Sequence, residues 1–260
     1  MNKADSPMES LILFARPPTP GRVKTRLIPA LGAEGAARLY RAFLADAAEG
    51  AAQVHEARPS AGLTAEWAIE NVPPGALSSE ALPLGAMPLD FWLPGPFLHR
   101  AQSGRDLGER MGAALGRRLA AGNMTSRPRR AVLIGTDFPD LPAEIVIEAF
   151  AALEEMERAV PGAPCAALGP SMDGGYYLIG LNRLSPGLFS GMEWGGSGVF
   201  RAQTERLESS GHRLHTLPEW SDVDTTGDLE RLRARLASHA GGQSPTAPNT
   251  RRMLEEIQEI

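Results

Sequence analysis

Three cations and a hydroxyl follow the first apolar run of the chain. The run covers residues 11–15, and the basic loop after it holds Arg22, Lys24, Thr25 and Arg26. A short aliphatic and aromatic run bounded by Pro and Gly is typical of a buried parallel strand. Ligands of open α/β sheets bind beyond the carboxyl ends of the strands, so we expect this loop at the binding edge. Cations there favour phosphate as the ligand over a merely solvated loop.

A carboxylate follows the second strongly apolar run, residues 131–135. Asp137 lies in the sequence GTDFPDLP, two residues beyond that run, and is expected at the same edge of the sheet. A carboxylate beside a phosphate-binding loop implies a cation between them, and oxygen ligands suit Mg²⁺ or Mn²⁺. Asp137 is placed too early to cap the next helix, whereas Asp140 is expected to cap it.

A second acidic stretch, SDVDTTGDL, lies in a predicted turn between a strand and a helix. Thr225 and Asp228 have the spacing of a capping box, so Asp228 is expected to be structural. Asp222 and Asp224 remain as candidates for the binding edge. Together with Asp137, either would fit a metal site for transfer at a phosphate.

A turn with two glycines, in PSMDGGYYLIG, is the next candidate. Gly174 and Gly175 would let the backbone approach a ligand closely, and Tyr176 or Tyr177 would stack on it. A plain hairpin turn explains the glycines equally well.

Several common motifs are missing. No GxGxxG follows a strand, and the Lys24-Thr25 pair lacks the glycine spacing of a P-loop. There is no GxSxG nucleophile elbow, and His212 and His215 do not have the spacing of a zinc site. The single cysteine, Cys165, is more consistent with a small core residue than with a nucleophile.

Composition narrows the class of protein. The 260 residues carry a net charge of −5, which argues against a protein that coats nucleic acid. No apolar stretch approaches the roughly 20 residues needed to span a bilayer, and the first residues lack the apolar core of a signal peptide. With one cysteine, the chain is expected in the cytoplasm. Its oligomeric state stays open.

Apolar runs alternate with amphipathic stretches along the chain, which predicts an α/β domain with a mainly parallel sheet and helices on both faces. We expect a single domain over residues 1–237, followed by a linker and a C-terminal helix over 238–260. Residues 71–96 show no period and are predicted to be a long irregular connection. The strands are predicted at 11–15, 62–69, 97–102, 131–135, 165–168, 176–181 and 213–217. The helices are predicted at 32–49, 106–121, 143–160, 197–210, 226–236 and 251–260.

Five of these stretches, in order, resemble a bacterial family described as arsenosugar-biosynthesis-type glycosyltransferases. That family is related to phospholactate guanylyltransferase and, more distantly, to molybdenum-cofactor guanylyltransferases. The likeness rests on FARPPTPGRVKTRL, RDLGERM, LIGTDFPDLP, GPSMDGGYYLIGL and DVDTTGDL, and runs from residue 11 to about residue 232. It implies the three-layer GT-A fold of nucleotide-diphospho-sugar transferases.

The resemblance also implies roles for individual residues. Lys24 and Arg26 would hold the nucleotide phosphates, with Thr25 and Arg16 nearby and Asp106 facing the nucleotide, although a helix cap is the simplest role for Asp106. Asp137 and Asp224 would hold the metal, with Asp137 and Lys24 as the catalytic pair. The loop of Asp173, Gly174 and Gly175, together with Tyr176, would line the sugar or acceptor site. The family usually continues after Trp194 with Ser-Thr/Ser-Pro, but this chain has Gly195-Gly196-Ser197.

The expected function is metal-dependent transfer of a sugar from a nucleotide sugar to a small acceptor. Two alternatives stay open: a nucleotidyltransferase that uses an NTP, and a protein that binds nucleotides without turnover. If Lys24 is an exposed phosphate ligand, its replacement by Ala should leave the melting temperature nearly unchanged, because exposed charges add little stability.

Overall fold

The central sheet is mostly parallel. The computed structural model describes residues 8–70, 95, 97–120, 129–238 and 246–258. Within these residues, seven strands form one sheet of order β3-β2-β1-β4-β6-β5-β7. The strands are β1 (Met8–Ala15), β2 (Thr64–Ile69), β3 (Leu98–Ala101), β4 (Arg129–Gly135), β5 (Cys165–Pro170), β6 (Tyr176–Leu181) and β7 (Arg213–Thr216). Every predicted strand is present.

Strand pairing places the predicted site residues at one edge. β1 pairs in parallel with β4, with Phe14 opposite Gly135, so the loops after both strands leave the sheet together. β6 runs antiparallel to β4 and to β5. The reversal follows from the short turn between β5 and β6, because a parallel pair would need a long crossover.

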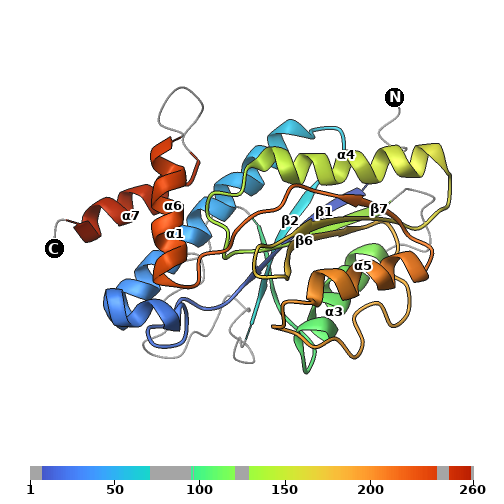
Figure 1. Ribbon diagram of the computed structural model, residues 1–260. Helices are drawn as coiled ribbons and strands as arrows, with labels where there is room; N and C mark the ends of the chain where they lie inside the picture. Colours follow the sequence, from blue (N-terminus) through green and yellow to red (C-terminus); the bar gives the residue numbers. More distant parts are fainter. Residues whose placement is uncertain (1–7, 71–94, 96, 121–128, 239–245, 259–260) are drawn as a thin grey trace, which may run out of the picture.

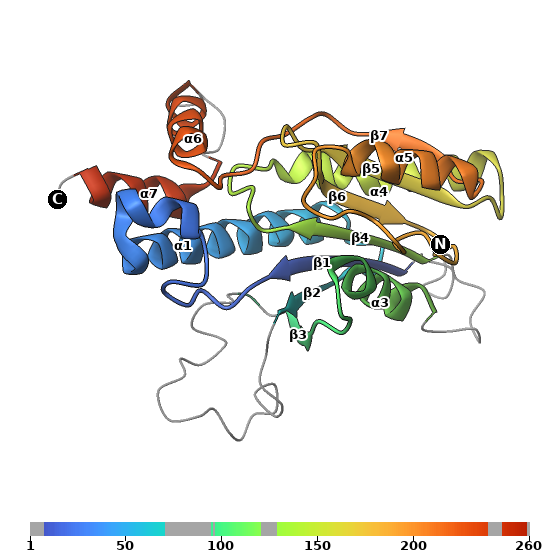
Figure 2. The same ribbon diagram turned by 60° about the horizontal axis from the view of Figure 1, so that its bottom comes forward.

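Helices cover both faces, as the three-layer prediction requires. Helices α1 and α4 lie on one face and α3 and α5 on the other (Figures 1 and 2). The helices are η1 (Thr25–Leu27), α1 (Ile28–Ala57), α3 (Leu107–Ala120), α4 (Ala143–Ala159), α5 (Val199–Ser209), α6 (Thr226–Ser238) and α7 (Pro248–Gln258).

Successive side chains of β1 pack into the cores on opposite faces of the sheet. Leu11 and Leu13 pack in the cluster that includes α1 and α4, whereas Ile12 packs in the cluster that includes α3 and α5. All three side chains are fully buried. A strand buried on both faces is apolar without interruption, which is the pattern seen in the sequence. Cys165 is also fully buried, as predicted for a core residue.

The long helix α1 extends beyond its predicted range at both ends. Gly32 interrupts its first turns with a φ of 69°, and the regular helix continues to Ala57. The side chain of Asp46, in α1, accepts a hydrogen bond of 2.9 Å from the backbone amide of Thr250. This bond fixes the start of α7 on α1. The predicted irregular connection at 71–96 and the predicted linker lie largely outside the described residues.

No helix in the described ranges is both long enough and apolar enough to cross a bilayer.

Candidate functional site

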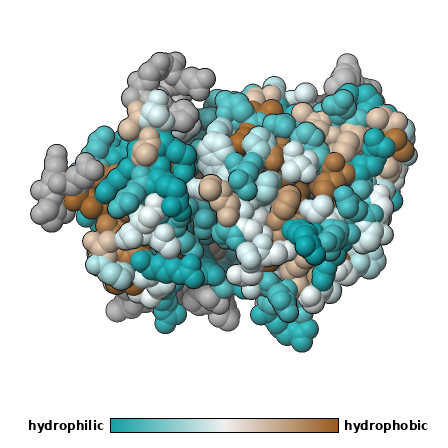
Figure 3. Space-filling model, viewed as in Figure 1, coloured by the Kyte–Doolittle hydropathy of each residue, from teal (hydrophilic) through white to brown (hydrophobic). Residues whose placement is uncertain are grey.

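A pocket of about 410 Å³ opens at the carboxyl edge of the parallel strands. The face drawn in Figure 3 is hollowed near its middle, beside hydrophilic surface. The pocket brings together side chains from the loops after β1, β2, β4, β5 and β7. Its lining includes Arg16, Lys24, Glu70, Arg110, Asp137, Asp173, Gly175, Tyr176, Trp194, Asp222 and Asp224.

Lys24 joins the two carboxylates that were predicted to share a metal. Its Nζ forms an ion pair with Asp137 and another, at 2.9 Å, with Oδ1 of Asp224. The Lys24 side chain is only 3% exposed, whereas the carboxylate side chains are 48% and 44% exposed. The expectation of an exposed Lys24 is therefore wrong: its charge is enclosed by the protein and neutralised from both sides.

Local backbone and two aromatic rings put Lys24 in this position. Its φ of 46° is left-handed, which is uncommon for a residue other than Gly. Nζ lies 5.8 Å from the ring centre of Tyr40 and 5.5 Å from that of Phe43. Burial by itself would lower the pKa of Lys24, but attraction to Asp137 and Asp224 outweighs it and raises the pKa. The ammonium therefore stays charged at neutral pH.

A short hydrogen-bond chain fixes the loop that carries Asp137. Tyr40 Oη accepts a bond of 3.1 Å from the amide of Arg16 and lies 2.9 Å from Oγ1 of Thr136. Thr136 in turn donates to the carbonyl of Phe14, at 2.9 Å. Burial, then the charge of Asp137, raises the pKa of Tyr40 to about 12, so its hydroxyl keeps its proton. The chain ties the ends of β1 and β4 together.

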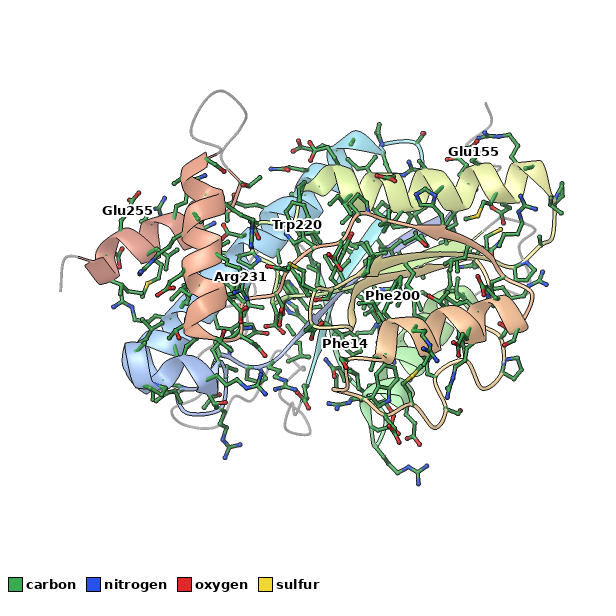
Figure 4. All side chains as sticks on the ribbon, viewed as in Figure 1. Phe14, Glu155, Phe200, Trp220, Arg231 and Glu255 are labelled. Atoms are coloured by element: carbon green, nitrogen blue, oxygen red, sulfur yellow. The ribbon has the colours of Figure 1, made fainter. Side chains whose placement is uncertain are left out.

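The predicted capping box holds Asp224 in place. Asp228 Oδ2 accepts the backbone amide of Thr225 at 2.6 Å and that of Asp224 at 3.1 Å, while Thr225 Oγ1 accepts the amide of Asp228 at 3.3 Å. Figure 4 labels Trp220 before this turn and Arg231 after it, on α6. The prediction that Asp228 is structural is confirmed.

Asp140 is structural, but it does not cap the helix after β4. Pro142 occupies the N-cap position of α4 without a side-chain hydrogen bond. Asp140 is 4% exposed and pairs instead with Arg235 of α6, at 2.7 Å. A side chain that reaches α6 cannot turn back to the first amides of α4, so the capping prediction is wrong.

Carboxylates outnumber cations in the pocket lining. Asp173 and Asp222 line it without an ion-pair partner among the described residues. Burial, and then repulsion from Asp173 and Asp224, raises the pKa of Asp222 to about 6. Negative charge gathered in this way is relieved when a cation binds.

The donor set partly fits a hard divalent ion. Asp137 and Asp224 each use Oδ1 for Lys24, and within the described ranges no hydrogen bond engages either Oδ2. Carboxylate oxygens are ligands that Mg²⁺ and Mn²⁺ accept. No group of three or more His, Cys, Asp or Glu residues in the described part of the chain forms a metal site by itself. Two carboxylates supply only part of a coordination shell.

A charged group that the sequence analysis missed lies on the other side of the pocket. Glu70 follows β2 directly and pairs with Arg16 at 2.6 Å and with Arg110 of α3. Its place just after a parallel strand is the signal that would have found it, since Asp137 was predicted by the same rule. Arg16 is 64% exposed despite this pair.

The turn after β5 and the segment before α5 form the remaining wall. A Cβ on Gly174, whose φ is +88°, would collide with the carbonyl oxygen of Ser197, so only glycine fits there. Tyr176 and Trp194 meet edge to face at 6.4 Å. Of the predicted turn residues, Asp173, Gly175 and Tyr176 line the pocket and Gly174 does not, while Trp194 is an addition to the predicted set.

Three predicted nucleotide ligands do not line this pocket. Thr25 and Arg26 are exposed on η1, next to the buried Lys24. Asp106 caps α3 by accepting the amide of Glu109 at 2.8 Å and lines a separate hollow between α3 and residues 184–191. These three residues therefore do not contact the pocket in the way that the resemblance implies.

Comparison with known proteins identifies the family. The chain is 30% identical to a candidate nucleotide-diphospho-sugar transferase from Desulfovibrio desulfuricans G20, with a TM-score of 0.77 over 100% of this chain and 98% of that one. A model for the family described as "Uncharacterized protein conserved in bacteria (DUF2064)" matches residues 76–196. The chain belongs to the same family as that nucleotide-diphospho-sugar transferase candidate. No curated protein matches it in sequence.

The chain has the nucleotide-diphospho-sugar transferase fold. The fold extends to a more distant structure, the 4-diphosphocytidyl-2C-methyl-D-erythritol synthase of Anaerococcus prevotii DSM 20548. Identity to it is 11% and the TM-score is 0.50, over 91% of this chain and 100% of that one. At that identity the likeness concerns the fold alone.

Proposed function

We propose that the protein is a metal-dependent transferase that moves a sugar from a nucleoside-diphosphate sugar to a hydroxyl of a small acceptor. The observation that carries the proposal is the meeting of Lys24, Asp137 and Asp224 at the carboxyl edge of the parallel strands. The proposal is also supported by the 30% identity to the nucleotide-diphospho-sugar transferase candidate from Desulfovibrio desulfuricans G20. The narrower arsenosugar-type assignment stays a prediction.

Asp137 and Asp224 would hold Mg²⁺ or Mn²⁺ through the oxygens that Lys24 leaves unengaged, and the donor diphosphate would supply further ligands. When bound, such an ion offsets the negative charge that develops on the leaving diphosphate. Arg22 and Arg26 are exposed beside Lys24 and have no ion pair among the described residues, so they are available to the phosphates. Arg16 can join them from across the pocket.

The transfer itself replaces one bond of the anomeric carbon with another. The bond to the diphosphate oxygen breaks and the nucleoside diphosphate leaves with the bonding electrons, a bond to the acceptor oxygen forms, and the acceptor hydroxyl releases its proton to solvent. The wall of Asp173, Tyr176 and Trp194 offers a carboxylate and two aromatic rings. These groups suit hydroxyls and the apolar face of a sugar ring, so we assign this wall to the sugar and acceptor.

Product analysis tests the proposal. The protein is incubated with Mn²⁺ and, separately, with nucleoside-diphosphate sugars and with NTPs, in the presence of a panel of hydroxylated acceptors. Release of a nucleoside diphosphate from a nucleotide sugar supports glycosyl transfer. Release of pyrophosphate from an NTP contradicts it and indicates nucleotidyl transfer. Nucleotide binding with neither product contradicts turnover altogether.

A further inference from the structure

Lysine is rare in this chain, and one of its few lysines is Lys24. Only two of the 26 Lys and Arg residues are lysines, Lys3 and Lys24. Every other cation is a guanidinium, which is planar and binds carboxylates through a broad fork. An ammonium is a compact point charge with three donors. The one lysine in the described residues therefore occupies the place where a small cation must fit between two carboxylates.

The surroundings of Lys24 leave little room for anything larger. Its side chain is 3% exposed, and its Nζ lies 5.8 Å from the ring centre of Tyr40 and 5.5 Å from that of Phe43. Nζ contacts one oxygen of Asp137 and, at 2.9 Å, one oxygen of Asp224. The second oxygen of each carboxylate has no hydrogen-bond partner in the described ranges, and both side chains are about half exposed. The ammonium is thus buried against two carboxylates that both line the pocket.

From this arrangement we propose that Lys24 is a positioning residue for metal binding, and not a phosphate ligand. Its ammonium holds the carboxylates of Asp137 and Asp224 side by side in the metal-free protein, with one oxygen of each left for a divalent ion. Without it, two like charges would repel and their loops would separate. The metal part of this inference rests on the proposed function, whereas the structural part does not.

A stability cycle tests the structural part without metal or nucleotide. Lys24→Met keeps an unbranched side chain, one atom shorter, with the same demand on the backbone, and removes the charge together with the hydrogen-bond donors. In the otherwise unchanged protein it should lower the melting temperature, because it leaves the two carboxylates without their shared cation. In the double variant Asp137→Asn/Asp224→Asn the buried ammonium has lost both anions. Adding Lys24→Met to that variant should instead raise the melting temperature, by about 2–4 °C or more.

A matched background controls for general effects of Lys24→Met. Asp222 lies on the same turn as Asp224 but does not contact Nζ. When Lys24→Met is introduced into the Asp222→Asn variant, it should therefore lower the melting temperature as it does in the unchanged protein. If Lys24→Met has the same effect in all three backgrounds, Lys24 is not coupled to the two carboxylates, and the proposal is overturned.

Binding of Mn²⁺ alone tests the metal part. Free Mn²⁺ is followed by electron paramagnetic resonance, with no nucleotide and no turnover. Lys24→Met and Lys24→Arg should each weaken Mn²⁺ binding by roughly 10- to 100-fold, as is usual when a residue that orients metal ligands is lost. Unchanged binding in Lys24→Met overturns the positioning role, and tighter binding shows that the ammonium competes with the ion.

The two proposals can fail separately. If the unchanged protein binds no Mn²⁺ with or without nucleotide, the metal dependence of the proposed function is lost, and the stability cycle still decides the role of Lys24. If Mn²⁺ binds but Lys24→Met has no effect on it, the proposed function stands and the inference about Lys24 falls. Full retention of Mn²⁺ binding by Lys24→Arg contradicts the need for a compact ammonium.

Discussion

The backbone amide of Val223 donates a hydrogen bond of 3.0 Å to the backbone carbonyl of Asp137. This contact joins two loops that follow different strands, β4 and β7, and each loop carries one of the carboxylates paired with Lys24. The distance between those carboxylates is thus set by the main chain as well as by the ammonium. We conclude that the acidic side of the pocket is built before any ligand arrives.

The capping box of α6 should matter for binding as well as for stability. Asp228→Ala removes the acceptor for the amides of Asp224 and Thr225, so the turn loosens. We expect a loss of about 1 kcal/mol in the free energy of unfolding, measured in urea, and weaker Mn²⁺-dependent nucleotide binding. Normal binding in a destabilised variant would show that the turn does not position Asp224.

The two glycines of the turn after β5 should behave differently. Gly174→Ala forces a Cβ against the carbonyl of Ser197 at a positive φ, so it should lower the melting temperature by several degrees. A Cβ on Gly175 would lie 3.1 Å from Oδ1 of Asp173, a side chain that is able to move. Gly175→Ala should therefore fold nearly normally and mainly reduce transfer activity. Equal effects on melting temperature would contradict this distinction.

The strands and helices could be predicted because each rests on local patterning. Uninterrupted apolar runs marked β1 and β4, and the Thr225–Asp228 spacing marked the start of α6. Asp137 and Asp224 followed from the same reasoning, since residues just after parallel strands share one edge. The rule also applies to Glu70, but the apolar pattern of β2 is weaker, so the end of that strand is less sharply marked in the sequence.

The burial of Lys24 could not be predicted in this way. It depends on a left-handed backbone at a residue other than glycine and on rings that α1 brings from outside the loop. The partner of Asp140 was missed for the same reason. Arg235 is 95 positions away, and no local spacing marks such a pair.

The exposed arginines beside Lys24 should bind phosphate. Arg26→Ala should leave the melting temperature unchanged and weaken nucleotide binding about three- to tenfold, an interaction of roughly 1 kcal/mol. The loss should shrink at high salt, where exposed charges are screened. Arg201→Ala on α5 is the matched control, because Arg201 is exposed but pairs with Glu205 at 3.0 Å. If the two variants bind nucleotide equally well, Arg26 has no role.

The central claim is that Asp137 and Asp224 bind one divalent ion together with a nucleotide. Titration calorimetry tests it, with Mn²⁺ present or removed by EDTA. The probe is whichever of UDP, GDP, ADP or CDP most raises the melting temperature of the unchanged protein. We predict that Asp137→Asn and Asp224→Asn each abolish the Mn²⁺-dependent part of nucleotide binding, and that the double variant is little worse than either. Mn²⁺-dependent binding that survives in either single variant at full affinity would contradict the account.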